Sequence, residues 1–136
     1  MARPRVALLS AIETVTPRIA STLDAAALCK MADRGQITGA LLDGPLALDN
    51  AVSLSAAKTK GIISPVAGQA DILVVPDLES GNILAKQLEY LADAAGAGLV
   101  IGARVPIVLT SRADPAPVRA ASCALALLMA NYKPKQ

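Results

Sequence analysis

The sequence predicts an α/β fold with a parallel or mostly parallel sheet flanked by helices. Short apolar runs alternate along the chain with helical segments, and each connection is long enough to carry a helix back over the sheet. The chain has 136 residues, of which 54% are hydrophobic. That length is enough for one compact domain and too little for two of ordinary size, so we expect one domain over residues 1–136.

The first predicted pair is a buried strand and a helix. Residues 6–11 form a short apolar run, which is typical of a buried strand. The following helix is expected to begin at Ser21 or Thr22, because a hydroxyl there can accept hydrogen bonds from the free amides of the first turn. Gly35 is expected to end it, since glycine readily adopts the conformation that follows a helix.

The second pair occupies residues 38–60. Residues 38–42 predict a strand that the segment Asp43-Gly44-Pro45 closes. Residues 48–60 predict one helix, ended by Gly61, because apolar side chains recur at helical spacing. The side chains expected on its inner face are Leu48, Val52 and Ala56.

The third pair is the clearest. Residues 71–75 are rich in β-branched side chains and predict a strand buried on both faces. In the helix that follows, Leu84, Leu88 and Leu91 share one face, while charged residues take the opposite side. This pattern predicts an amphipathic helix at the surface.

The last part of the chain predicts one or two strands and a helix. Apolar runs at residues 98–102 and 105–109 are separated at Gly102, and the sequence leaves open whether they form one broken strand or two. After a loop at residues 111–117 comes an alanine-rich helix, which we expect to be mostly buried. Its apolar side chains include Leu125, Leu128 and Met129.

The composition excludes several kinds of chemistry. The sequence contains no histidine, so Ser-His-Asp triads, Cys-His dyads and histidine-ligated zinc sites cannot be assembled from it. A net charge of +2 and the absence of Phe and Trp disfavour binding of single-stranded nucleic acid. Cys29 and Cys123 have no Cys-x-x-Cys spacing, and we interpret both as buried free thiols.

The expected location is the cytoplasm, with no membrane partner. The longest apolar stretch, residues 120–130, is too short to span a bilayer. Glu13 interrupts the apolar run at the N-terminus, and no clear signal-peptide cleavage site follows it.

Candidate site residues follow the predicted strands, because ligands of open parallel sheets bind outside the carboxyl ends of the strands. Thr110, Ser111 and Arg112 place two hydroxyls and a guanidinium at a helix entrance, where a phosphate is favoured. The structural alternative is that Ser111 caps the last helix while Arg112 pairs with a surface carboxylate. Residues 13–16 follow the first strand in the same way.

The segment 76–82 is the third candidate. Its two carboxylates could position a cation, a ligand hydroxyl or a neighbouring loop, and the alternative is ordinary helix capping by Asp77, Glu79 or Ser80. The sequence lacks the Gly-x-Gly-x-x-Gly fingerprint, which disfavours a dinucleotide site. Three further cations are interpreted as solvated surface: Lys58, Lys60 and Arg104.

Several longer phrases of the sequence resemble the phosphate acetyl/butyryltransferase family. In chain order they are STLDAAAL (21–28), DGPLALDNA (43–51), SPVAG (64–68), PDLESGN (76–82) and PIVLTSR (106–112). The similarity runs from about residue 6 to residue 129. The phrase GPLALDN looks closest to the butyryl branch and to the type fused behind an enoyl-CoA hydratase domain.

The resemblance implies transfer of an acyl group between coenzyme A and inorganic phosphate. It implies a two-domain fold similar to isocitrate and isopropylmalate dehydrogenases, acyl-CoA and phosphate as substrates, and no metal or organic redox cofactor. Carried over by motif, Arg112 would hold phosphate or acyl phosphate, with Thr110 and Asn82 as further ligands of phosphate or CoA. Ser111 would hydrogen-bond the reacting centre.

Two departures from the family pattern bear on activity. The acetyl branch carries an acidic residue several positions after the Ser-Arg pair, whereas residues 115–118 here are Pro-Ala-Pro-Val, which leaves Asp114 as the candidate general base. Family members are more than twice as long, so the chain looks like the C-terminal half.

Two hypotheses follow. The first is an acyltransferase portion that needs a homo-oligomeric partner or a separate N-terminal half. The second is a non-catalytic ligand-binding or interaction module that retains the fold. Because a cut in a two-domain fold leaves apolar surface uncovered, we also expect self-association or poor solubility.

Overall fold

The computed structural model describes residues 3–132 and divides into two compact units, Met1–Ile83 and Leu84–Gln136. The boundary falls inside helix α4 (Leu78–Leu91). The first unit contains a sheet of three parallel strands, and the second contains a pair of antiparallel strands. The α/β class is therefore confirmed, whereas the prediction of parallel strands holds only for the first unit.

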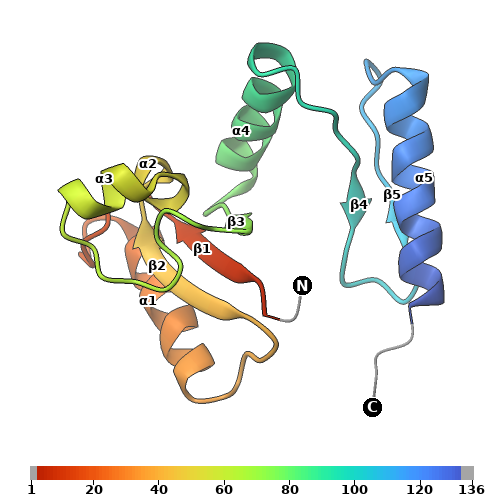
Figure 1. The fold of residues 1–136 in the computed structure, drawn as a ribbon. Helices are drawn as coiled ribbons and strands as arrows, with labels where there is room; N and C mark the ends of the chain where they lie inside the picture. The colour runs from red at the N-terminus through yellow and green to blue at the C-terminus, as the bar shows by residue number, and fades with distance from the viewer. Residues whose placement is uncertain (1–2, 133–136) are drawn as a thin grey trace. The chain divides into compact units, whose positions relative to one another are not determined.

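Strand β1 (Arg5–Leu9) is the centre of the first sheet (Figure 1). It pairs with β2 (Leu41–Leu46) on one side and with β3 (Ile72–Val74) on the other. Four of its five residues are buried, because both of its edges are covered by neighbouring strands and its faces by packed side chains. The apolar run at residues 6–11 thus forms the predicted buried strand, which ends at Leu9.

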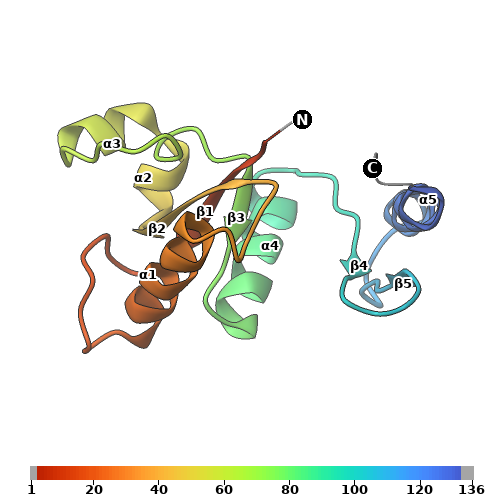
Figure 2. The ribbon, with the colours of Figure 1, turned by 90° about the horizontal axis from the view of Figure 1, so that it is seen from below.

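Helix α1 (Ala20–Asp33) packs against β1 and β2 (Figures 1 and 2). The buried residues of this core are Val6, Leu8 and Ala25. The alanine brings the helix axis close to the sheet, so a small side chain here contributes to dense packing. Partly buried apolar side chains surround this group: Leu28, Cys29, Ala40 and Leu42.

The start of α1 differs from the prediction, because neither Ser21 nor Thr22 is its cap. The capping position is held by Ile19. Thr22 is instead fully buried in the first turn, where its Oγ1 accepts a hydrogen bond from the Thr16 amide at 2.9 Å and lies 2.8 Å and 2.7 Å from the carbonyl oxygens of Thr16 and Ile19. The hydroxyl therefore fixes the loop before the helix. The helix ends before Gly35, as predicted, and Gly35 has a φ of +72°.

Strand β2 begins three residues later than predicted and continues through the segment expected to close it. A side chain at Gly44 would place its Cβ 2.7 Å from both the Cβ and the carbonyl oxygen of Leu8. Glycine is therefore required for the close approach of β2 to β1. The register between these two strands shifts near the same point.

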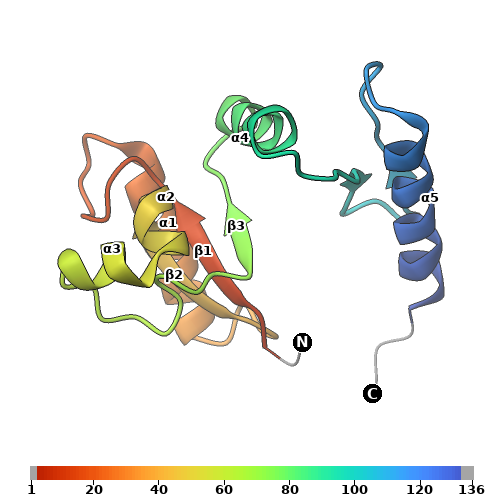
Figure 3. The ribbon, with the colours of Figure 1, turned by 45° about the horizontal axis from the view of Figure 1, so that its top comes forward.

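The single helix predicted over residues 48–60 is two short helices, α2 (Leu48–Val52) and α3 (Leu54–Thr59). They are separated by Ser53, which is extended and whose Oγ accepts a hydrogen bond from the Ala56 amide at 3.3 Å. Serine is a favoured helix cap, so it ends one helix and starts the next. Figure 3 shows the two helices as separate turns.

The predicted inner face of this segment is wrong. Leu48 and Val52 are 42% and 53% exposed. The interruption between the two helices breaks the continuous helical periodicity on which the prediction rested, so different positions face inward. The buried residues are Asn50, Ala51 and Ala57.

Strand β3 is shorter and more exposed than predicted. Within residues 3–132 it pairs only with β1, so Ile72 and Val74 are 45% and 40% exposed. Helix α4 follows it at the predicted place and lies at the surface, since none of its residues is buried. Its predicted apolar face is not covered by the described residues, because Leu88 and Leu91 are 46% and 83% exposed.

The second unit contains β4 (Leu99–Val100), β5 (Ile107–Val108) and α5 (Ala116–Asn131) (Figure 1). The two apolar runs are thus separate strands. They pair in antiparallel fashion because the short connection between them, in which Gly102 has a φ of +95°, reverses the chain. This corrects the expectation of a parallel sheet for this part of the chain.

The prediction that α5 is mostly buried is also wrong. Leu125, Leu128 and Met129 are 43%, 69% and 41% exposed. Cys123, which we expected to be buried, is exposed as well, whereas Cys29 in α1 is partly buried. The alanine-rich helix forms as predicted, but its apolar side chains are not covered by the described residues.

Ser122 attaches α5 to the strand pair. It is the one buried residue among residues 84–132. Its Oγ accepts a hydrogen bond from the Gly98 amide at 3.0 Å and donates one to the Val118 carbonyl at 2.9 Å. A single hydroxyl thereby connects the chain just before β4 to the helix.

Candidate active site

The loop between β5 and α5 carries four of the five predicted site residues: Thr110, Ser111, Arg112 and Asp114. The Ser111 amide donates a hydrogen bond to Asp114 Oδ2 at 2.7 Å, and the Asp114 amide donates one to the Ser111 carbonyl at 3.1 Å. These two bonds close a turn around the exposed Arg112. The structure therefore brings Ser111 and Asp114 together and leaves the guanidinium at the tip of the turn.

The structural alternative for this loop is not found. Helix α5 begins at Ala116 with Pro115 in the capping position, so Ser111 lies outside the helix and does not cap it. Within the part of the chain that the structure describes, the ion pairs do not include Arg112. The Ser111 hydroxyl accepts only a long hydrogen bond, 3.3 Å, from the Ala113 amide. Neither side chain is accounted for by a strong structural contact.

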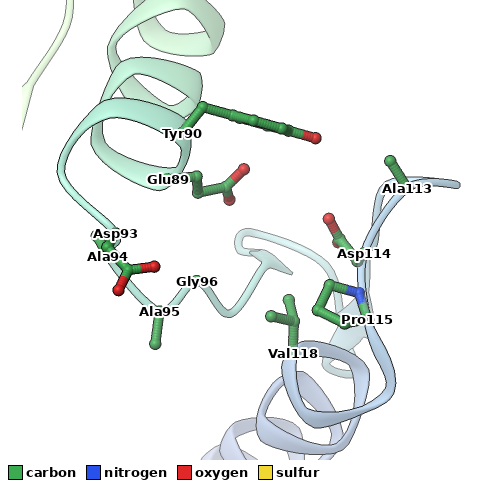
Figure 4. Close-up of a pocket in the computed structure, with 10 residues that line it drawn as sticks. All are labelled: Glu89, Tyr90, Asp93, Ala94, Ala95, Gly96, Ala113, Asp114, Pro115 and Val118. Atoms are coloured by element: carbon green, nitrogen blue, oxygen red, sulfur yellow. The ribbon is translucent and has the colours of Figure 1, made fainter.

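A cavity of about 490 Å³ adjoins this loop within the second unit (Figure 4). Its lining includes Glu89 and Tyr90 at the end of α4, the segment 93–96, and residues 113–115 with Val118. Small-molecule sites have volumes of roughly 300–1,000 Å³. The cavity therefore has the size of a ligand site, and of the predicted site residues it is lined by Asp114.

The polar groups of the cavity are mainly acidic. In Figure 4 the carboxyl groups of Glu89, Asp93 and Asp114 point into it, and the Tyr90 side chain extends toward the loop that holds Ala113. Sequence reasoning placed Glu89 and Asp93 on the solvent side of an amphipathic helix and did not single out Tyr90. The one sequence feature that could have suggested a role for these residues in the site is their position, one turn or less from the end of a helix that leads toward the β4–β5 strands.

Lys86 is paired with one member of this acidic group. Its Nζ lies 2.6 Å from Glu89 Oε2 and 5.7 Å from the centre of the Tyr90 ring. The hydrogen bond with Glu89 raises the pKa of Lys86 above its ordinary value, and the charge of Asp114 contributes. Lys86 therefore stays charged and partly offsets the carboxylates.

Asn82, the fifth predicted site residue, is exposed in the second turn of α4 and belongs to the first unit. Nearby, Asp77 Oδ1 accepts hydrogen bonds from the Ser80 amide at 2.7 Å and from the Ser80 hydroxyl at 2.5 Å. These bonds lower the pKa of Asp77. For Asp77 the capping interpretation is thus confirmed, while the role of Asn82 stays a prediction.

A second polar cluster, in the first unit, was missed by sequence reasoning. Lys60 Nζ bridges Glu13 at 3.4 Å and Asp49 at 3.1 Å, although Lys60 was interpreted as solvated surface. The fully buried Asn50 donates from Nδ2 to Glu13 Oε2 at 3.2 Å, and its Oδ1 has no hydrogen-bond partner among the described residues. The cluster connects the loop after β1 to the helices after β2. Glu13 lies 47 residues and Asp49 lies 11 residues before Lys60 in the chain, so no local sequence pattern reveals that the three side chains meet.

The comparisons with known proteins identify the family. The family model described as "Phosphate acetyl/butaryl transferase" matches residues 1–126. The chain belongs to this family. It is 71% identical over 127 residues to a phosphate acetyltransferase of Rickettsia prowazekii, and the match covers 93% of this chain and 36% of that relative. A probable phosphate butyryltransferase of Bacillus subtilis is 56% identical over 124 residues, covering 91% of this chain and 42% of the relative.

Solved structures of the phosphate acetyl/butyryltransferase family are similar to this chain. A branched-chain phosphotransacylase from Enterococcus faecalis has a TM-score of 0.83 at 36% identity, and the match covers 98% of this chain and 48% of that one. A phosphotransacetylase from Streptococcus pyogenes has a TM-score of 0.73 at 28% identity, with 93% and 39% covered. The chain thus spans less than half the length of these family members.

The family prediction is confirmed, and the preference for the butyryl branch stays a prediction because relatives of both names match. Within the described residues, no helix is long and apolar enough to cross a membrane. Groups of three or more residues suited to holding a metal ion are also absent from residues 3–132.

Proposed function

We propose that this chain acts in the transfer of an acyl group between coenzyme A and inorganic phosphate, which interconverts acyl-CoA plus phosphate with acyl phosphate plus CoA. The observation that carries the proposal is the family membership, over residues 1–126. The loop geometry supports it, because Ser111 and Arg112 are placed on a tight turn without a structural contact that would explain both side chains.

In this reaction a phosphate oxygen attacks the carbonyl carbon of the thioester. The new carbon–oxygen bond forms, the carbon–sulfur bond breaks, and CoA leaves as a thiolate that takes up a proton. Arg112 would hold the phosphate, since a guanidinium can donate two parallel hydrogen bonds to it. Ser111 would donate to the oxygen on which charge develops, with Thr110 and Asn82 as further ligands.

Asp114 has two roles in the proposal. As a general base it would accept the thiol proton of CoA when acyl phosphate is the acyl donor. Its hydrogen bond to the Ser111 amide, 2.7 Å, uses Oδ2 and also holds the turn in shape. The proposed chemistry needs no metal or organic cofactor, because phosphate is itself the nucleophile and the thioester supplies the leaving group.

We propose further that the active protein includes more than the span described here. The curated relatives quoted above extend well beyond the matched region, which covers 36% and 42% of their length. Several apolar side chains of α5 are exposed, which favours a covering partner. The remaining part would come from a homo-oligomeric partner or a separate N-terminal half, would complete a fold similar to isocitrate and isopropylmalate dehydrogenases, and would act in the cytoplasm.

The test is release of free thiol from acetyl-CoA and butyryl-CoA in the presence of phosphate. The chain is assayed alone and mixed with the N-terminal part of the Rickettsia relative, as wild type, as Arg112→Ala and as Arg104→Ala. Arg104 is a matched control, because it is an exposed arginine on the β4–β5 connection. We expect Arg112→Ala to lower turnover about 100-fold or more, the usual effect of removing one charge-stabilising donor, and Arg104→Ala to leave it unchanged.

Turnover that is insensitive to Arg112 would refute the assignment of the loop. The absence of turnover in the folded mixture would refute the acyltransferase proposal and favour the ligand-binding or interaction module. The rate ratio between the two thioesters would assign the branch.

A further inference from the structure

Strand β3 has the composition of a strand from the middle of a sheet but lies at its edge. All its residues are apolar, and such runs are typical of parallel strands that are covered on both faces. Among the residues that the structure describes, however, β3 pairs only with β1 (Figure 3), and Ile72 and Val74 are 45% and 40% exposed. An exposed apolar edge strand is a template for pairing with another polypeptide.

The direction of the backbone amides defines what this edge offers. The Asp71 amide donates to the Arg5 carbonyl of β1 at 2.8 Å. Because successive amides of a strand point to opposite sides, the Leu73 amide also points toward β1, and the amides of Ile72 and Val74 point away from it. We call this side, with the N–H and C=O groups of Ile72 and Val74, the open edge. It offers two donors and two acceptors to a further strand.

A groove beside the open edge shows which face of β3 is uncovered. Ile72 and Val74 are in register with Val6 and Leu8, which belong to the core under α1, so their side chains lie on the α1 side of the sheet. A cavity of about 90 Å³ lies there between α1 and β3, and its apolar lining includes Leu8, Ala25, Leu28 and Val74. Small-molecule sites have volumes of roughly 300–1,000 Å³, so this cavity fits inserted side-chain carbons rather than a whole ligand.

The direction of the additional strand separates the candidate occupants. A second copy related by a twofold axis would present the same edge, and two identical edges pair in antiparallel fashion. The uninterrupted apolar run of β3 indicates instead a parallel neighbour, and parallel strands are joined by connections that carry a helix over the sheet. Such a helix would lie beside α1 and cover Ile72 and Val74. The occupant is therefore a strand with its helix from a different α/β segment.

We propose that the open edge of β3 pairs with a parallel strand from the N-terminal part of the acyltransferase, and that the helix connected to this strand packs beside α1 with side chains in the groove. The inference rests on the proposed function in that the active protein includes more than this span. It assigns a surface of the first unit, separate from the exposed face of α5. A strand and a helix need about 20 residues, and the match covers only 36% of the Rickettsia relative, so enough polypeptide lies outside it.

The experiment measures hydrogen exchange at individual amides of β3. The 136-residue chain is compared with a fused chain in which it replaces the matched region of the Rickettsia relative, and protected β1 amides show that the first unit is folded in both. In the chain alone we expect the Ile72 and Val74 amides to exchange at least about tenfold faster than the Leu73 amide, which points toward β1. In the fused chain they should slow to about the Leu73 rate. Unchanged exchange at Ile72 and Val74 in the fused chain would overturn the proposal.

A second copy is tested with the 136-residue chain alone at rising concentration. Light scattering measures its oligomeric state while hydrogen exchange is followed at the same amides. We expect Ile72 and Val74 to keep their fast exchange at all concentrations. If both become protected as the chain dimerises, the open edge belongs to a second copy and the proposal is overturned.

Two lysine variants test the side-chain face of β3 in the fused chain. Val74→Lys places a charge beneath the proposed helix, where it would be costly to bury. We expect the Ile72 amide to exchange at least about tenfold faster relative to Leu73 in this variant. Val52→Lys is the matched control, because Val52 is a 53% exposed valine on α2, and it should leave the Ile72 rate unchanged. An Ile72 rate that does not respond to Val74→Lys would contradict the proposed cover.

Thiol release separates this inference from the proposed function. If the fused chain releases thiol from acyl-CoA and phosphate while Ile72 and Val74 exchange as fast as in the chain alone, the pairing at the open edge is refuted and the acyltransferase function stands. If the two amides are protected and thiol is not released, the pairing stands and the acyltransferase function is refuted.

Discussion

Thr22 offers the sharpest test of how the first unit is held together. Its side chain is fully buried, and its hydroxyl accepts from the Thr16 amide at 2.9 Å while it donates to the carbonyl of Thr16 or Ile19. A hydroxyl has one proton, so it serves one of these carbonyls at a time. Thr22→Val keeps the shape of the side chain and removes both hydrogen bonds. The Thr16 amide is then left without a partner near a buried position.

An unpaired buried donor costs about 1–3 kcal/mol. We therefore expect Thr22→Val to lower the free energy of unfolding by about 2 kcal/mol, which corresponds to a fall of about 1 M in the urea midpoint for a typical slope of about 2 kcal/mol per M. Far-UV circular dichroism is the suitable probe because the chain has no tryptophan. Amide exchange at Thr16 should accelerate in the variant.

Thr59→Val is the matched control. Thr59 is exposed and donates from Oγ1 to the Ser55 carbonyl at 2.9 Å, so the loss of its hydroxyl should change stability by less than about 0.5 kcal/mol. If Thr22→Val and Thr59→Val have the same urea midpoint, the buried hydroxyl does not hold the loop and the account given for the start of α1 is wrong.

Three further predictions concern pH, thiol reactivity and the second unit. Hydrogen bonds from Arg5 lower the pKa of Asp71 to about 2, below its ordinary value of 3.8, so this pair stabilises the fold fully above pH 4 and loses its effect as pH falls toward 2. The difference in urea midpoint between wild type and Asp71→Asn should be constant from pH 5 to 7 and shrink toward zero near pH 2. A difference that grows with acidity would contradict this sign. Burial raises the pKa of Cys29 from 9.0 to about 11, with the charges of Asp43 and Asp33 adding to the effect, whereas Cys123 is exposed. A disulfide reagent at pH 8 should modify Cys123 quickly and Cys29 roughly 100-fold more slowly until the chain is unfolded. Two equal fast rates would show that Cys29 is accessible. Ser122→Ala leaves the Gly98 amide without its hydrogen-bond partner at 3.0 Å. The amides of residues 98–109 should therefore exchange their hydrogens faster, while those of β1 keep their rates. Unchanged hydrogen exchange at Gly98 would mean that the hydroxyl does not attach α5 to the strand pair.

Local signals in the sequence predicted most elements of the first unit. The β-branched run before Pro76 and the apolar run after Pro4 each specify a strand by composition alone, and Gly35 ends α1 where a left-handed residue is needed. One of the errors there, the end of β2, is caused by a tertiary contact. The close approach of Gly44 to Leu8 extends β2 beyond its expected end, and no local pattern encodes the identity of that neighbour.

The candidate site was predictable where it depends on one loop. The phrase Thr110-Ser111-Arg112 follows a strand and precedes a helix, so its position at a helix entrance could be inferred. Glu89 and Tyr90 could not be assigned to the same site, because they lie twenty or more residues earlier in the chain and their positions fit an ordinary solvent face. The cavity that joins these segments is a property of the folded second unit.

Burial in the second unit was mispredicted for a different physical reason. Hydrophobic periodicity indicates that a face is covered in the working protein, but it does not say which polypeptide segment covers it. Leu127 and Leu128 of α5 are 66% and 69% exposed, and Ser122 alone is buried among residues 84–132. A 16-residue helix of this composition does not hold its place through one hydroxyl. The apolar face of α5 therefore supports the proposal of a covering partner, and a variant such as Leu128→Lys should weaken assembly with the N-terminal part of a relative while leaving the first unit folded.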